Sequence, residues 1–367
     1  MNVMSELPLD GNLLMSVLRR CETWIVTTHV RPDADAIGSA MAAVRLIEKM
    51  GRRARLVADF SLTPKLQFLD PDARLERLGE NVTVESLTAS AEPPGTTGIL
   101  VVDMSSWSQM GGFADVFRNF RGPKVIVDHH LESVKFDPEV MIFRDSDASA
   151  AGELLLRLIQ TATEPMISLD ASLAVPLFAA LATDTGWFRF DSVTSTTYRS
   201  AATLMEAGAE PATIYRAIYE QESFAGRRLL GRFMDHIELH FGGRLATVCL
   251  SRDDFAQTGA LRSDCEDMVN EPLRIRGVQI VVFLSEQEPK PGQTPEIRLS
   301  FRSSCDFNCA EFAKEQFGGG GHAAAAGATS FVSLEQTLRQ ILSAMEPILT
   351  DGKNPDPGER PDETLSP

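Results

Sequence analysis

Residues 24–35 read WIVTTHVRPDAD, an apolar run that passes directly into histidine and aspartate. The run over 24–28 predicts a buried strand, and the pattern over 36–50 predicts the helix that follows it. This alternation of strand and helix continues through the first half of the chain. It predicts an α/β fold built on a parallel sheet.

The same pattern defines the other elements of the first half. Strands are predicted at 55–58, 98–102, 124–127 and 140–143, and helices at 150–161, 171–183 and 194–206. We therefore expect an N-terminal parallel-sheet domain over 1–210.

A second α/β pattern follows a charged helical stretch, which we interpret as a helical linker over 211–240. Its strands are predicted near 245–251, 278–285 and 296–301, and its terminal helix over 334–349. We expect a smaller α/β domain over 241–349. Residues 350–367 are rich in proline and poor in apolar residues, which predicts a disordered tail.

The charge and cysteine content exclude several classes of protein. With 35 basic and 51 acidic residues, the net charge is -16, which argues against a protein that coats long nucleic acid with a basic surface. The longest apolar stretch, near 173–182, is too short to span a bilayer, and the first residues do not resemble a signal peptide. The five cysteines form no CxxC pair. We expect a cytoplasmic protein without a membrane partner.

Histidine and aspartate follow several of the predicted strands, and Asp184 ends an apolar helix; the full set is His29, Asp33, Asp35, Asp103, Asp128, His129, His130 and Asp184. The carboxyl ends of parallel strands form the functional crevice of such sheets. Any one of these residues alone is more often a cap or a structural residue. Together they favour a metal site, because crowded carboxylates repel one another without cations. Imidazole with carboxylate suits manganese, and the set is large enough for two ions sharing one carboxylate.

The spacing of these residues resembles the signature motifs of the DHH phosphoesterases. The matching segments are His29-x-x-x-Asp33-x-Asp35-x-x-Gly38-Ser39, the isolated Asp103, Asp128-His129-His130 and Asp184. Residues 317–327, FGGGGHAAAAG, are similar to the glycine-rich motif of the DHHA1 domain, and Arg302-Ser303 to the pair that precedes it. The resemblance covers residues 10–348. Size and layout are most similar to the NanoRNase branch of oligoribonucleases and pAp phosphatases.

The resemblance implies a role for each motif residue. One Mn²⁺ would be held by His29, Asp33 and Asp103. The second would be held by Asp35, Asp103, His129 and Asp184, with Asp103 bridging the two. Asp128 would orient a histidine ligand, and His130 would face the scissile phosphate. Substrate would be bound by Arg302, Ser303, Gly319, Gly320, Gly321 and His322.

The function implied is hydrolysis of very short oligonucleotides to mononucleotides, with removal of the 3′-phosphate of 3′-phosphoadenosine 5′-phosphate as a second activity. A hydrolase of cyclic di-AMP or linear pApA and a nucleotide-binding regulator without catalysis are the alternatives. Long nucleic acid is not expected as a partner. The sequence does not decide between a monomer and a homodimer.

Four further features of the sequence each allow two interpretations. Gly38-Ser39 suits a closely packed helix start or a phosphate contact. The glycines before His322 suit a flexible turn or an anion cradle. For residues 187–190, WFRF, core packing is favoured over base stacking. His236 and His240 have helical i, i+4 spacing, for which a solvated face is favoured over a metal pair.

Overall fold

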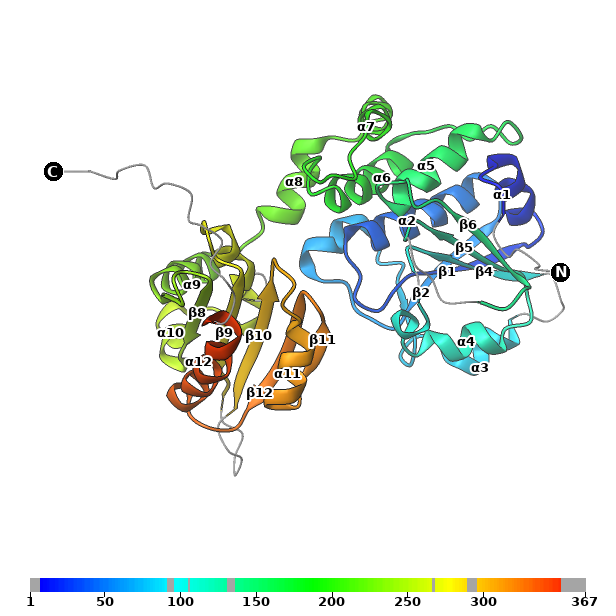
Figure 1. Cartoon of the computed structure of the whole chain (residues 1–367). Helices are drawn as coiled ribbons and strands as arrows, with labels where there is room; N and C mark the ends of the chain where they lie inside the picture. The colour runs from blue at the N-terminus through cyan, green and yellow to red at the C-terminus, as the bar shows by residue number, and fades with distance from the viewer. Residues whose placement is uncertain are drawn as a thin grey trace. The chain divides into compact units, whose positions relative to one another are not determined.

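The computed structural model describes residues 7–90, 96–104, 106–130, 136–265, 268–288 and 296–350. The chain divides into two compact units, Met1–Gln221 and Glu222–Pro367. Each unit is an α/β structure built on its own six-stranded sheet (Figure 1). The predicted α/β fold class is therefore confirmed.

The first unit contains a parallel sheet with the strand order β3-β2-β1-β4-β5-β6. The strands are β1 (Thr23–Thr27), β2 (Arg53–Ala58), β3 (Glu76–Arg77), β4 (Thr97–Val102), β5 (Lys124–Asp128) and β6 (Val140–Arg144). All five predicted strands are present, and the two-residue β3 is an addition. The central strands are buried on both faces, as expected for near-continuous apolar runs in a parallel sheet.

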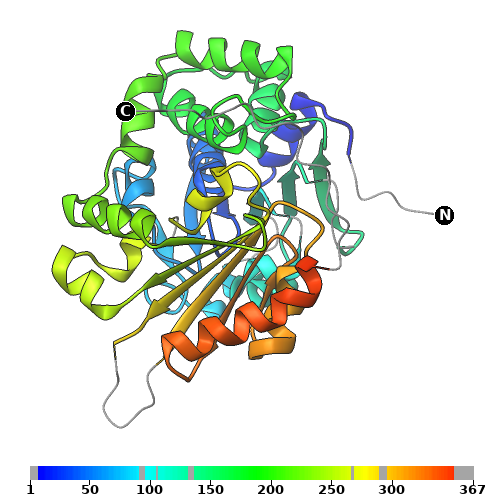
Figure 2. The same ribbon diagram turned by 60° about the vertical axis from the view of Figure 1, so that its left-hand side comes forward.

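Helices cover both faces of this sheet (Figures 1 and 2). One layer packs with Trp24 and Val26; it consists of α1 (Gly11–Leu18), α2 (Ala34–Lys49), α5 (Ala151–Thr161), α6 (Ala171–Asp184), α7 (Ser195–Glu206) and α8 (Pro211–Tyr219). The other packs with Ile25 and consists of α3 (Val84–Ala89), η2 (Trp107–Met110) and α4 (Phe113–Asn119). Alternate residues of β1 thus enter different cores.

The helices α2 and α6 approach each other closely at Gly38. A Cβ atom at this position would lie 2.3 Å from the carbonyl oxygen of Pro176. Gly38 and Ser39 are both buried inside α2. The close-packing interpretation of this pair is therefore confirmed.

The stretch predicted as a helical linker is only partly helical. Helix α8 ends at Tyr219, and α9 (Phe224–Asp235) begins beyond the boundary between the two units. The helical prediction is wrong for β7 (Ile237–His240), which pairs antiparallel with β8 (Leu245–Leu250). The glycines at 242 and 243 allow a turn with positive φ, so the chain folds back into a hairpin instead of extending α9.

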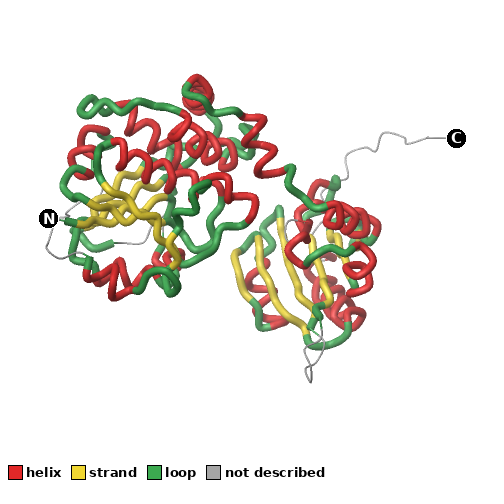
Figure 3. The backbone as a smooth tube through the Cα atoms, turned by 180° about the vertical axis from the view of Figure 1, so that it is seen from behind, coloured by secondary structure: helices red, strands yellow, loops and turns green. Residues whose placement is uncertain are grey.

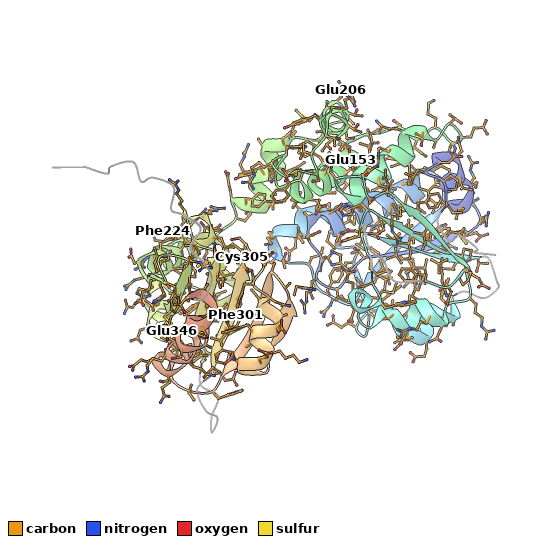
Figure 4. All side chains as sticks on the ribbon, viewed as in Figure 1. Glu153, Glu206, Phe224, Phe301, Cys305 and Glu346 are labelled. Atoms are coloured by element: carbon orange, nitrogen blue, oxygen red, sulfur yellow. The ribbon has the colours of Figure 1, made fainter. Side chains whose placement is uncertain are left out.

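The second unit has a mixed sheet in the order β11-β12-β10-β9-β8-β7, with only the β8–β9 pair parallel. Its remaining strands are β9 (Ile280–Glu286), β10 (Ile297–Ser303), β11 (Gly320–His322) and β12 (Ala325–Ser330). One core lies under α11 (Cys309–Phe317) and α12 (Leu334–Thr350), the other under α9, α10 (Arg252–Thr258) and η4 (Met268–Arg274) (Figure 3). The fully buried Phe301 belongs to the first of these cores (Figure 4).

The predicted tail begins at Thr350, which still belongs to α12; residues 351–367 lie outside the described part of the chain. Among the described residues, no helix combines the length and apolar character needed to cross a membrane. The cysteines form no disulfide bond within the described part of the chain.

Candidate metal centre

The carboxyl edge of the first sheet collects the predicted ligands from several segments. His29 follows β1, Asp103 follows β4 directly, and His129 follows β5 directly. Asp35 lies in the first turn of α2, and Asp184 is the last residue of α6. Residues more than 150 positions apart in the chain therefore meet at one edge, as the topology of a parallel sheet requires.

Three overlapping groups of side chains lie around Asp103, and one of them consists of Asp103, His129 and His130. His29, Asp33 and Asp103 form one group whose donor atoms lie within 4.8 Å of one another. One oxygen of Asp103 lies 3.5 Å from Nε2 of His29, and the other lies 3.5 Å from Nε2 of His129. Asp103 has φ of 52°, a left-handed conformation that costs energy in a residue other than glycine. The backbone is thus held in an unusual state where its carboxylate faces two histidines.

The second group consists of Asp35, His129 and Asp184. Nε2 of His129 lies 3.8 Å from Asp35 and 3.5 Å from Asp184. In the first group, Asp33 has two roles, because Oδ1 caps α2 by accepting the N–H of Ala36 while the residue remains in reach of His29. The capping and ligand interpretations are therefore compatible.

The side chain of Asp35 is held by the N-terminus of α5, a contact that the sequence does not predict. Its carboxylate accepts the backbone N–H groups of Ala151 at 2.7 Å and Gly152 at 3.0 Å, at the N-terminus of α5. The hydroxyl of Ser39, one turn along α2, donates to it at 2.8 Å. Glu153 secures α5 in turn by accepting the N–H of Ser149, within the helical layer seen in Figure 4.

The two histidines of the DHH motif have different partners. Nδ1 of His129 lies 3.2 Å from the carbonyl oxygen of Ala148, which makes Nδ1 the donor and leaves Nε2 for a metal. Nδ1 of His130 lies 2.7 Å from Oδ1 of Asp128. Asp128 therefore orients His130, whereas a backbone carbonyl orients His129. That Asp128 orients a metal-ligating histidine stays a prediction, since His130 also forms a possible metal-binding group with Asp103 and His129.

The charges at this edge are not balanced by the protein alone. Burial, with repulsion from Asp103 and Asp184, raises the pKa of Asp35. Burial, with repulsion from Asp33, raises the pKa of Asp184 to about 6. Burial opposes a charge on His129, but its carboxylate neighbours outweigh burial and raise its pKa to about 10.

A divalent cation fits this donor set. Ligands about 2.0–2.2 Å from an ion lie at most about 4.4 Å apart, so the groups need only small side-chain adjustments to bind one. Cations would also replace the protons that the raised pKa values otherwise require. The described residues therefore include clusters of aspartate and histidine that are able to hold metal.

The predicted substrate residues of the second unit lie on two faces of its sheet. Arg302 pairs with Ala325 on β12, which pairs with His322 on β11. Residues directly opposite in antiparallel strands share a face, so Arg302 and His322 share one. Ser303 belongs to the other face, and its hydroxyl donates to the carbonyl of Cys305.

The glycine-rich segment forms a strand over Gly320–His322, so the flexible-turn interpretation, which the sequence left open beside the anion cradle, does not hold for these residues. Gly320, Gly321 and His322 form β11 and are exposed. Gly321 has φ of 150°, and a Cβ there would lie 2.5 Å from the carbonyl oxygen of Ala325. Gly319 likewise lies against the carbonyl oxygen of Gly327. Glycine is needed because the two strands approach so closely.

Two other open interpretations are decided by the geometry. His236 ends α9 and bonds the carbonyl of Cys249, whereas His240 lies on β7 and bonds Thr247, so the helical metal pair does not form. Trp187 and Phe188 pack against the main core, as favoured. Phe190 differs, because 54% of it is exposed.

Comparison with known proteins shows the relatives of this chain. A model of the DHH family, N-terminal domain, matches residues 23–181, and a model of the DHHA1 domain matches residues 244–351. The bifunctional oligoribonuclease and PAP phosphatase NrnA of Thermus thermophilus is 30% identical, over 92% of this chain and 94% of its own length. The protein of the same name from Bacillus subtilis is 24% identical over 87% of this chain and 92% of its own length.

A solved structure shares the fold. The crystal structure of an exopolyphosphatase-related protein from Bacteroides fragilis superposes with a TM-score of 0.75 at 22% identity, covering 93% of this chain and 97% of that chain. The metal-ligand clusters, the order of the motifs and these matches lead to one conclusion. The chain belongs to the DHH family of phosphoesterases, with a DHHA1 domain after the DHH domain.

Proposed function

We propose that this protein is a two-metal phosphohydrolase that cleaves very short oligoribonucleotides to mononucleotides and removes the 3′-phosphate of 3′-phosphoadenosine 5′-phosphate. The observation that carries the proposal is the position of Asp103 between the two ligand groups, with one oxygen facing each histidine. A carboxylate with one oxygen towards each ion can hold two ions next to each other. The relatives named above, whose lengths this chain nearly spans, support the choice of substrate.

Two Mn²⁺ ions are proposed for the site, held by His29, Asp33 and Asp103 on one side and by Asp35, Asp103, His129 and Asp184 on the other. When bound, they would neutralise charge on the phosphate and activate the attacking water. The oxygen and imidazole donors, without thiolate, favour manganese over zinc.

The other proposed roles in the reaction belong to side chains and backbone groups of the protein. Asp128 holds the ring of His130 with Nδ1 as the donor, which leaves Nε2 free to bond a phosphate or leaving oxygen. Hydrolysis adds one water, breaks one P–O bond, and leaves a hydroxyl on one product and a phosphate monoester on the other. In the second unit, Arg302 and His322 are proposed to bind substrate phosphate, together with Ser303 and the N–H groups of Gly319, Gly320 and Gly321.

A turnover panel tests this proposal. The Mn²⁺-loaded protein is incubated with 3′-phosphoadenosine 5′-phosphate, linear pApA, cyclic di-AMP and RNAs of 2–10 nucleotides, and products are separated by chromatography. We expect mononucleotides from the shortest RNAs and AMP from the bisphosphate. The Asp103→Asn variant controls for contaminating nucleases. Faster turnover of cyclic di-AMP than of the other substrates would show that the proposed substrate is wrong. If the metal-loaded protein turned over no substrate, it would be a nucleotide-binding regulator.

Two further properties complete the proposal. A cytoplasmic location is supported by the lack of disulfide bonds among the described residues, since a reducing compartment disfavours them. A homodimer is a further prediction, to be tested by light scattering on the purified protein.

A further inference from the structure

Arg144 is a neighbour of Asp128 on the adjacent strand. None of the family motifs quoted above contains it. The strands β5 and β6 run in parallel with Asp128 paired directly to Arg144. Nε of Arg144 lies 3.5 Å from Oδ2 of Asp128, and the side chains are 11% and 0% exposed. Two opposite charges are therefore buried next to each other at the carboxyl ends of β5 and β6.

The two oxygens of Asp128 face two different neighbours. Oδ1 accepts Nδ1 of His130, whereas Oδ2 faces Arg144 and has no hydrogen-bond partner among the described residues. A fully buried carboxylate that lacks a nearby cation is strongly unfavourable. Arg144 supplies that cation from the side opposite to His130.

The orientation of the Asp128 carboxylate decides how His130 is held. Oδ1 accepts Nδ1 of His130, which leaves Nε2 of the same ring available. Rotation of the carboxylate away from His130 would break this contact. The contact between Arg144 and Oδ2 keeps Oδ1 facing His130.

We propose that Arg144 is a positioning residue for the hydrolytic reaction. Its guanidinium faces Oδ2 and fixes the orientation of the Asp128 carboxylate, and Asp128 in turn holds the ring of His130 in one orientation. Because His130 acts in the hydrolysis described above, this inference rests on the proposed function. It adds a third member, from β6, to a pair that the sequence motif already contains.

Variants at two arginines separate positioning from general stability. Arg144→Met removes the charge, and Arg144→Lys keeps it. Arg157→Met is the matched control, because Arg157 forms an ion pair with Asp145, the neighbour of Arg144, without contacting His130. We expect Arg144→Met to lower kcat about 10–100-fold, the range for partners that orient site residues. KM and bound Mn²⁺ should stay unchanged, Arg144→Lys should recover most of kcat, and Arg157→Met should keep it.

A second readout does not depend on turnover. The hydrogen-bonded imidazole N–H of His130 is identified in NMR spectra of the whole protein by its loss in His130→Gln. We expect this signal in the wild type, Arg144→Lys and Arg157→Met, and its loss in Arg144→Met. If Arg144→Met does not fold, Arg144→Gln takes its place.

An unchanged imidazole signal in folded Arg144→Met, or a kcat equal to that of Arg157→Met, would overturn the inference. Failure of the proposed function has a different signature. In that case the wild type would hydrolyse no substrate of the panel, while the imidazole signal would still decide whether Arg144 positions His130.

Discussion

The carboxylate of Asp35 accepts the backbone N–H of Ala151 at 2.7 Å across 116 residues of sequence. The N-terminus of a helix carries partial positive charge and free N–H groups, so α5 binds this carboxylate much as it would bind an anion. Asp35 is 1% exposed, and its carboxylate is held by contacts within the protein. The metal site is therefore built on contacts between α2 and α5 as much as on the ligands.

Ser39→Ala should weaken metal binding. The hydroxyl donates to Asp35 at 2.8 Å, and loss of a bond that orients a metal ligand reduces affinity about 10–100-fold. Titration with Mn²⁺ by calorimetry measures this. The control is Ser200→Ala, since Ser200 is also buried and its hydroxyl donates to Glu153, which is not a ligand. Equal Mn²⁺ affinity in the two variants would contradict the role of Ser39.

Arg302→Ala should raise KM and leave the metal content unchanged. Loss of a hydrogen bond to a charged group costs about 1.5–3 kcal/mol, which corresponds to roughly a 10- to 150-fold fall in kcat/KM. Arg298→Ala is the control, because Arg298 lies four residues earlier on the same strand and is exposed on the same face. Steady-state kinetics with a dinucleotide compare them. A loss of Mn²⁺ from Arg302→Ala would argue against separate metal and substrate residues.

Removal of metal should make stability fall as the pH rises. Asp184 has a raised pKa of about 6, so its contribution to folding is present below pH 4 and is lost as the pH approaches about 6. His129, with a pKa raised to about 10, contributes fully below pH 6.5 and loses that contribution towards pH 10. In both cases the folded protein binds more protons than the unfolded chain.

Thermal unfolding of EDTA-treated protein between about pH 5 and about pH 9 covers the loss at Asp184 and the start of the loss at His129, and Tm should decrease across the series. Added Mn²⁺ should raise Tm more at the alkaline end, because the cations compensate carboxylates that are no longer protonated. The double variant Asp184→Asn/His129→Gln should show a flatter pH dependence. A Tm that rises with pH in the metal-free wild type would be inconsistent with the electrostatics.

Phe301→Ala should destabilise the second unit. Phe301 is fully buried between β10 and α11, and truncation of such a side chain costs about 3–5 kcal/mol. Phe224→Ala should change stability by less than about 0.5 kcal/mol, since Phe224 is 82% exposed (Figure 4). Denaturant unfolding followed by circular dichroism compares the two variants. Similar losses of stability in the two variants would contradict the exposure of Phe224 in the structure.

Much of this architecture could be predicted because it depends on local patterns. The run from Trp24 to Thr28 marks a strand by its apolar, β-branched composition, and parallel topology then brings Asp103 and His129 to one edge. The contacts that orient the ligands could not be predicted. The carbonyl of Ala148 and the amide of Ala151 carry no side-chain signal, and they meet His129 and Asp35 only through long-range packing.

The corrections have similar causes. The charged pattern before His240 suited a helix, but pairing with β8 made 237–240 a strand, since tertiary contacts override local propensity. A run of glycines is typical of a turn. In the structure these glycines form β11 because they pair closely with β12. Asp128 and His130 are two residues apart, so their contact could have been inferred from local geometry.

The number of metal ions bound per chain tests the central claim most directly. Native mass spectrometry of the Mn²⁺-loaded protein, compared with Asp103→Asn, counts them. We predict two Mn²⁺ ions per wild-type chain and reduced occupancy of both sites in the variant, because Asp103 faces both ligand groups. One ion per wild-type chain, or two ions retained in Asp103→Asn, would contradict the two-metal site.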